Sequence, residues 1–212
     1  MDQFSMMTDT SALESCVPFY VDHYQYLSFY KISSIEGAQT ENLYVNLTVF
    51  AVGKRDVHIL LSENINPSPK TPVYEIVIGA NENTRVLLRK RIYSSDSLYS
   101  LDQHRVLYEN EANEINITVS RGGEIKIVLN QRETHIIKDV EVIPLNFFSF
   151  ASFDWEPLEY YYNCSSRRNS QRFPNSLTKV TNFTTQNLPP PQLKFSKLYK
   201  RMSSSSEKNC QH

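Results

Sequence analysis

Cysteine is scarce in this sequence of 212 residues, and its few copies are widely spaced. The three cysteines, Cys16, Cys164 and Cys210, form no CxxC motif and no Cys/His cluster. We therefore expect reduced thiols, with no disulfide framework and no metal site. Reduced thiols are typical of intracellular proteins, and the sequence accordingly predicts a cytoplasmic protein, with a nuclear or secreted location as the alternatives.

Long apolar runs are lacking as well. No run reaches about 18 apolar residues, which predicts that the chain has no transmembrane helix. Residues 1–16 are acidic and rich in Ser and Thr, without the basic and apolar regions of a signal peptide, and we expect a flexible leader there. Four Asn-x-Ser/Thr sequons would favour secretion if they carried glycans, although the first two fall in predicted strands: Asn46, Asn116, Asn163 and Asn182.

Acidic residues are nearly absent from the far end of the chain. Residues 165–212 contain nine Lys or Arg and one Glu, a net charge of +8, whereas residues 1–164 carry 13 basic and 22 acidic residues, a net charge of −9. Because the acidic part would repel phosphate groups, we expect no nucleic acid to bind the folded domain. Residues 165–212 are rich in Ser, Asn, Gln and Pro, which predicts a disordered basic tail able to contact an acidic surface.

Between these ends, apolar and polar residues alternate at the period of β-strands. The clearest alternation lies in residues 43–51, where Leu43, Val45 and Leu47 share one face. Short segments of this kind recur about every ten residues, with no amphipathic helix between them, as in sandwich proteins. Residues 17–164 are therefore predicted to form one all-β domain, an antiparallel β-sandwich of jelly-roll-like type.

A central hairpin can be predicted from residues 73–91. Tyr74, Ile76 and Ile78 share one face of a strand that Gly79 ends, and a turn at residues 81–84 precedes a second alternating strand. The preceding residues, 56–63, also form a predicted strand. These three strands are expected to share a buried face.

A second hairpin can be predicted from residues 115–129. Its register pairs Val119 with Ile125, which requires an odd number of loop residues, and the three residues 121–123 provide glycine for a left-handed position. The stretch between the two hairpins is less regular. We expect residues 94–103 to form a loop and residues 104–109 a short strand.

The central hairpin resembles a known family, the farnesoic acid O-methyltransferase-like domains, which occur largely in invertebrates. In that family a strand reading roughly D-A-H-I-x-L precedes Y-E-I-x-I-G-G-W-G-N-T-x-S-x-I-R, and the spacing of the second hairpin is also similar. Matching or conservative residues are Asp56, His58, Ile59, Leu61, Tyr74, Glu75, Ile76, Ile78, Gly79, Asn83, Thr84, Leu88 and Arg89. The family's Gly-Trp-Gly is replaced by Ala80, Asn81 and Glu82, so the chain resembles a diverged member.

The family name implies methyl transfer from S-adenosylmethionine to farnesoic acid, a step in the synthesis of sesquiterpenoid (juvenile) hormones. The five glycines of this chain form no glycine-rich turn that opens a helix, so the doubly wound fold usual for that cofactor is not expected. The candidates for an acid/base pair are His58 and Glu75, on neighbouring predicted strands. Both have the strand parity opposite to the main apolar residues, which favours solvated positions on an outer face.

We therefore favour a non-catalytic binding or interaction module without a cofactor, and keep methyl transfer as the alternative. The ligand or protein partner is not identified by the sequence. Candidate binding residues are the turn residues Gly79, Asn81 and Asn83, together with Trp155. A second possibility is an aromatic platform for a glycan, a lipid or a single strand of nucleic acid, formed by Tyr20, Tyr24, Tyr26, Tyr30 and Tyr44, although aromatic residues also simply suit strands.

Overall fold

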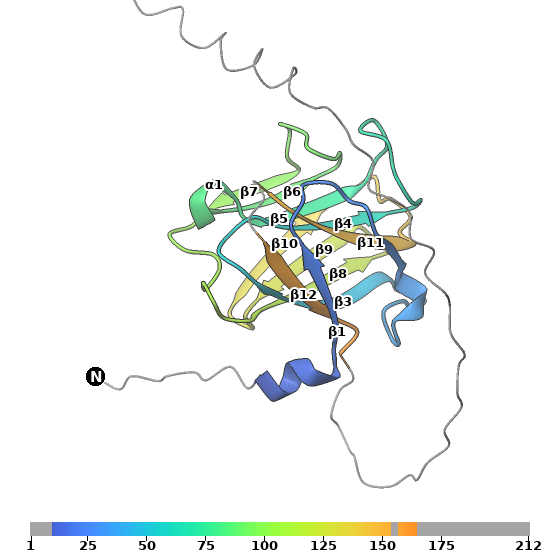
Figure 1. The fold of residues 1–212 in the computed structure, drawn as a ribbon. Coiled ribbons are helices and arrows are strands. Elements are labelled where there is room, and N and C mark those ends of the chain that lie inside the picture. Colours follow the sequence, from blue (N-terminus) through green and yellow to red (C-terminus); the bar gives the residue numbers. More distant parts are fainter. Residues whose placement is uncertain (1–9, 154–156, 165–212) are drawn as a thin grey trace, which may run out of the picture. The chain divides into compact units, whose positions relative to one another are not determined.

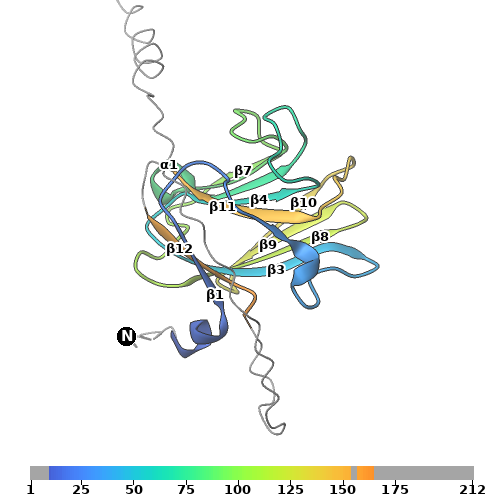
Figure 2. The same cartoon turned by 45° about the vertical axis from the view of Figure 1, so that its right-hand side comes forward.

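The protein is an antiparallel β-sandwich in the computed structural model, which describes residues 10–153 and 157–164. The first sheet has the strand order β1 (Val17–Val21), β12 (Leu158–Tyr162), β3 (Leu43–Val52), β8 (Asn113–Ser120), β9 (Glu124–Leu129) and β10 (Glu133–Lys138). The second has the order β2 (Phe29–Lys31), β11 (Phe147–Ser152), β4 (Val57–Ser62), β5 (Tyr74–Gly79), β6 (Arg85–Arg89) and β7 (Tyr99–Asp102). The sheets lie as two layers in Figure 1, and the turned view in Figure 2 shows the same arrangement. The predicted fold class is confirmed.

The core lies between the two sheets, where alternate residues of each strand point inward. On β3 the buried positions include Val45, Leu47 and Val49, which confirms the alternation seen in the sequence. The second sheet contributes residues such as Ile59 and Ile76, both fully buried. Burial of these Val, Leu and Ile side chains between the two sheets is the main favourable contribution to folding.

The second sheet is covered on its outer face as well. Every residue of β4 and of β5 is buried, although an outer strand face of a simple sandwich would be solvated. On this face Leu60 of β4 and Ala151 of β11 form an apolar cluster with Tyr26 and Val73, and Phe29 and Ile92 pack against it. This cover determines the environment of the candidate site.

The second hairpin is confirmed residue by residue. Val119 pairs with Ile125, and residues 121–123 connect β8 to β9. Gly123 has a φ of +86°, and a Cβ at this position would lie 2.0 Å from the carbonyl oxygen of Asp139. Glycine is therefore required here both by the left-handed conformation and by the close approach of another chain segment.

The turn of the central hairpin is a single short helical turn, α1 (Ala80–Asn83), with left-handed φ values at Asn81, Glu82 and Asn83. The side chain of Asn83 also fixes the segment expected to form a strand at residues 104–109. Its amide Nδ2 donates to the carbonyl of Leu107 (2.8 Å), and its Oδ1 accepts from the Leu107 backbone N–H (2.8 Å). These bonds replace strand pairing, so the expected strand at residues 104–109 is wrong and the edge strand β7 lies in the expected loop.

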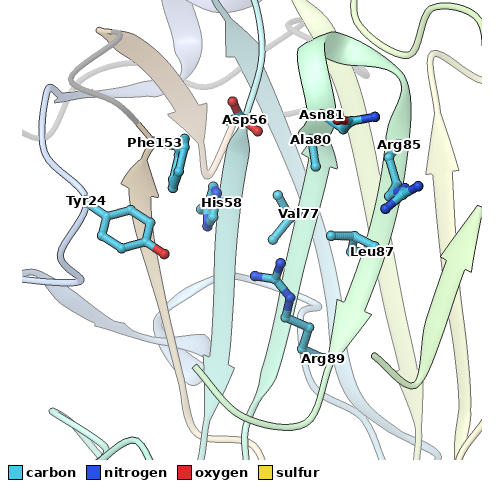
Figure 3. Close-up of a pocket in the computed structure, with 10 residues that line it drawn as sticks. All are labelled: Tyr24, Asp56, His58, Val77, Ala80, Asn81, Arg85, Leu87, Arg89 and Phe153. Carbon is cyan, nitrogen blue, oxygen red and sulfur yellow. The ribbon is translucent and has the colours of Figure 1, made fainter. Parts of the chain in front are cut away.

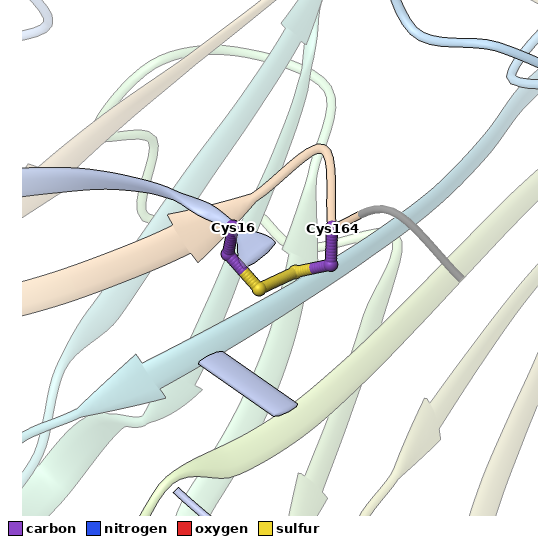
Figure 4. The surroundings of a disulfide bond; sticks show 2 residues. All are labelled: Cys16 and Cys164. Carbon is purple, nitrogen blue, oxygen red and sulfur yellow. A yellow bond between two sulfur atoms is a disulfide. The ribbon is translucent and has the colours of Figure 1, made fainter. Parts of the chain in front are cut away.

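A disulfide joins Cys16 to Cys164, which lie 148 residues apart in the sequence (Figure 4). The prediction of reduced thiols is wrong for this pair. The reason is the strand pairing. β1 and β12 are antiparallel neighbours, and Val17 pairs with Tyr162 at one end of this pair of strands. Cys16 and Cys164, which lie just beyond that end, are therefore brought together. The premise for a cytoplasmic location is thereby removed, whereas the location itself stays a prediction.

The two predicted end segments fall largely outside the described residues. Residues 1–9 and the tail at 165–212 belong to that part, as do Cys210 and the Asn182 sequon. The rest of the expected leader contains a 3-10 helix, Thr10–Ser15. A further 3-10 turn, Ile32–Ser34, follows β2. Within the described residues no helix has the length and apolar character needed to cross a membrane.

Candidate functional site

A cleft of about 300 Å³ opens on the outer face of the second sheet. Its floor is formed by strands β4, β5 and β6, and loop residues close it on either side (Figure 3). The lining side chains are Tyr24, Asp56, His58, Val77, Ala80, Asn81, Arg85, Leu87, Arg89 and Phe153. Because β-strands place alternate residues on this face, one strand contributes Arg85, Leu87 and Arg89 together.

The cleft has an apolar floor and an aromatic side. Val77, Ala80 and Leu87 form a small apolar cluster on the outer face. Tyr24 and Phe153 lie together on the opposite side from Asn81 and Arg85 in Figure 3, with ring centroids 5.1 Å apart.

Tyr24 is held in this position by a second ring. Its ring stacks on that of Tyr93 at 4.1 Å, and Tyr93 adopts a left-handed φ of 57° that is uncommon for an aromatic residue. Because the ring of Tyr93, far from Tyr24 in the sequence, stacks on the ring of Tyr24, the aromatic side is preorganised for contact with a ligand.

The charged side chains of the cleft are paired. Arg85 forms an ion pair with Asp102 of the edge strand β7. Arg89 lies 3.1 Å from Glu75, and Asp56 lies 3.7 Å from its chain neighbour Arg55. Three cations therefore accompany three carboxylates, and the cleft carries polar groups of both signs without an excess of either charge.

Glu75 is fully buried beside the cleft and is the centre of a hydrogen-bond network. Its Oε1 accepts a hydrogen bond from the Tyr26 hydroxyl (2.9 Å). Its Oε2 accepts from Nη1 of Arg89 (3.1 Å) and from the backbone N–H of Tyr93 (2.9 Å). Nδ1 of His58 lies 3.7 Å from Oε1. Both carboxylate oxygens are thus engaged by groups from four chain segments.

This network keeps Glu75 ionised. Burial by itself raises the pKa of a carboxyl group, but the contacts with His58, the Tyr93 N–H and Arg89 outweigh burial and hold the pKa of Glu75 below its ordinary value. Burial, together with the charge of Glu75, raises the pKa of the Tyr26 hydroxyl well above its ordinary value. A carboxylate stabilised in this way is a weak proton acceptor and is poorly suited to act as a general base. Its hydrogen bonds to Tyr26 and to the Tyr93 backbone instead suit it to holding these covering segments on the sheet.

The candidate pair His58 and Glu75 therefore lies close together, as expected, but not in the expected environment. Both residues have the predicted outer-face parity, yet His58 is 3 % exposed and Glu75 is 0 % exposed. The expectation of solvated positions is wrong because Tyr26 and the segment around Tyr93 cover this part of the sheet.

The candidate turn residues divide into different roles. Asn81 lines the cleft, whereas Asn83 is bound to the backbone of Leu107 and does not line it. Gly79 has a φ of +81°, and a Cβ there would lie 2.8 Å from the Leu107 side chain, so its role is conformational. Trp155 lies outside the described residues.

Sequence reasoning missed Arg85 and Leu87 as a pair on one face, although the alternation predicted for the second strand of the central hairpin implies it. The five tyrosines do not form one platform. Tyr24 lines the cleft, whereas Tyr30 and Tyr44 pack against the sandwich core.

A second cleft of about 250 Å³ is lined by Tyr26, Tyr93, Asn66, Pro67 and Ile92, among others. The described residues contain no group of three or more His, Cys, Asp or Glu side chains placed to hold a metal ion.

The fold and the cleft define a β-sandwich protein with a ligand-sized hollow on the outer face of one sheet. Residues 20–166 match the family described as farnesoic acid O-methyl transferase, and the chain belongs to this family, as the resemblance of the central hairpin predicted. No curated protein matches the chain significantly.

Several solved structures are similar to this chain at low identity. The carbohydrate-binding module CBM66 from Bacillus subtilis is 12 % identical with a TM-score of 0.42, over 60 % of this chain and 75 % of that one. The galectin LEC-6 from Caenorhabditis elegans is 11 % identical with a TM-score of 0.42, over 68 % of this chain and 94 % of that one. A β-glucanase from Bacillus licheniformis is 11 % identical with a TM-score of 0.36, over 70 % and 76 %.

Proposed function

We propose that this protein is a non-catalytic binding module whose ligand occupies the outer-face cleft. The proposal rests on an open cleft that is lined by both polar and apolar side chains. The carboxylate beside it, that of Glu75, already accepts hydrogen bonds at both oxygens. Clefts with an apolar floor and a few fixed polar groups are the usual form of small-ligand sites.

Methyl transfer is supported less well by this geometry. A methyltransferase has to hold its cofactor and the acceptor carboxylate side by side. The cleft volume of about 300 Å³ lies at the lower end of the range for sites that hold a single small ligand. The balanced charges also leave no cation in excess for a carboxylate substrate.

The proposal predicts that small ligands bind here rather than elsewhere on the domain. Small polar fragments can be screened by NMR, with binding monitored through the amide chemical shifts of 15N-labelled protein. We expect the hits to shift the amide signals of Val77, Ala80 and Leu87. Asn81→Gly, which preserves the left-handed backbone but removes the amide side chain, should weaken these hits.

The matched control is Asn110→Gly, which replaces an exposed asparagine that also has a left-handed φ and does not line the cleft. This variant should leave the hits unchanged. Shifts confined to the second cleft, around Asn66 and Ile92, would contradict the assignment of the ligand site.

A further inference from the structure

We propose that the ligand is a neutral saccharide, bound in the cleft through its hydroxyl groups and the C–H face of a sugar ring. This inference rests on the proposed function and adds the chemical class of the ligand. It follows from three properties of the cleft: its charge balance, the kind of polar groups it presents, and the division of its surface into an aromatic and a polar side.

The charge balance favours an uncharged ligand. Arg85 and Arg89 would attract an anion if they were unpaired, but Asp102 and Glu75 lie against them. Asp56 adds a further carboxylate to the lining, and Arg55 lies beside it. Counted over the cleft and the partners beside it, three cations accompany three carboxylates, so Coulomb attraction would supply little of the affinity of a phosphate, sulfate or carboxylate.

The polar groups of the lining are those that bind hydroxyl groups well. A guanidinium has five N–H donors, and the ion pairs described for Arg85 and Arg89 each involve one nitrogen of the side chain. Asn81 offers its amide oxygen as an acceptor and one N–H as a donor, since the other N–H donates to the Thr84 hydroxyl (3.2 Å), and the Asp56 carboxylate is an acceptor. A sugar hydroxyl both donates and accepts, so adjacent hydroxyls can use these groups in pairs.

The arrangement of aromatic and polar side chains in the cleft also fits a sugar ring, which has an apolar face and a polar edge. Tyr24 and Phe153 face Asn81 and Arg85 across the cleft in Figure 3, with Val77 between them on the floor. A pyranose ring presents C–H groups on its face and hydroxyls at its edge. Its face can lie against the aromatic side and its edge against the polar side.

An apolar chain such as a terpenoid fits less well. It would desolvate Arg85, Arg89 and Asn81 without offering hydrogen bonds in return, and buried polar groups left unpaired are costly. The apolar part of the lining is short, consisting of Val77, Ala80 and Leu87 with the two aromatic rings.

The test is an array of neutral oligosaccharides printed beside their sulfated and sialylated counterparts, probed with the 212-residue protein. We expect retention on one or more neutral saccharides, with binding that does not weaken as NaCl is raised from low to physiological concentration. For the best saccharide, Asn81→Gly and Arg85→Ala should each raise the Kd about tenfold, the effect of losing one hydrogen bond to a ligand.

Arg85→Ala removes an ion pair between partly exposed side chains, so the variant should fold normally. Arg121→Ala is the matched control, because Arg121 lies in the loop between β8 and β9 of the other sheet and does not line the cleft. Asn110→Gly is the control for the asparagine variant. Both controls should bind the saccharide as the wild type does.

Retention on no neutral saccharide would overturn the inference, and so would retention on anionic saccharides alone that is lost in salt. Binding that is insensitive to both cleft variants would overturn it too. The proposed function has a separate readout, because fragments that shift the amides of Val77 and Leu87 would still identify the cleft as a ligand site for another class of molecule.

Discussion

Glu75→Gln is expected to lower the free energy of unfolding by about 3 kcal/mol, the size of effect seen when one partner of a buried charge pair is removed. The carboxylate is 0 % exposed and accepts hydrogen bonds from Tyr26, Arg89 and the Tyr93 backbone. A glutamine presents one carbonyl oxygen and an NH₂ group, so at least one of these donors loses its acceptor, and Arg89 loses its counter-charge. The free energy of unfolding is measured by urea titration, with unfolding monitored by far-ultraviolet circular dichroism.

Glu36→Gln is the control for this change, because Glu36 is exposed and its neutralisation should alter stability by a few tenths of a kcal/mol at most. A stability of Glu75→Gln equal to that of the control would show that the network does not hold the cover of the second sheet in place.

The same carboxylate predicts how stability depends on acid. The pKa of Glu75 is lower in the folded protein than its ordinary value, so the unfolded chain takes up a proton first. The stabilisation is therefore complete above the unfolded pKa of about 4.3 and is lost as the pH falls through the folded pKa. We expect the difference in stability between wild type and Glu75→Gln to shrink in this acid range.

Loss of the disulfide is expected to lower the free energy of unfolding by about 2–4 kcal/mol, since it closes a loop of nearly the whole domain. Cys16→Ser, Cys164→Ser and the double variant should be destabilised equally, because each change removes the same bond. Thermal unfolding with and without a reductant measures the effect, and reductant should lower the melting temperature of the wild type towards that of the variants.

Cys210→Ser is the control, and it should leave both the melting temperature and its response to reductant unchanged. Peptide mapping under non-reducing conditions should recover the Cys16 and Cys164 peptides joined. Free thiols at both positions in protein purified without reductant would contradict the bond.

The sequence was sufficient to predict β3 and the hairpin of β8 and β9, with its loop, in detail. Alternation gave β3, and parity fixed both the register of Val119 with Ile125 and the three residues between β8 and β9. Period-two patterns are local, so they specify which face of a strand is buried without knowledge of its neighbours. The same rule placed His58 and Glu75 correctly on the outer face of the second sheet.

The covering of that outer face could not be predicted with the same rule. Alternation reports one buried face, and the residues that bury the other face come from Tyr26 and the segment around Tyr93, far away in the sequence. One signal was present, since β4 and β5 are continuously apolar apart from His58, Glu75 and short polar ends. Such continuity indicates burial on both faces.

The disulfide was missed for a related reason. Wide sequence spacing between Cys16 and Cys164 says nothing about distance in space, which depends on the pairing of β1 with β12. The aromatic side of the cleft depends on the same kind of information. Arg85 and Asn81 come from one hairpin, but the opposing rings of Tyr24 and Phe153 are brought there by tertiary packing.

The central claim, a binding module without methyl transfer, is tested most directly by calorimetric titration of the 212-residue protein. S-adenosylmethionine and farnesoic acid are each added in the presence and absence of the other, and the products are examined for methyl farnesoate. The account predicts no saturable heat from the cofactor and no methyl ester. Saturable binding of S-adenosylmethionine that is strengthened by farnesoic acid, with formation of the ester, would contradict it.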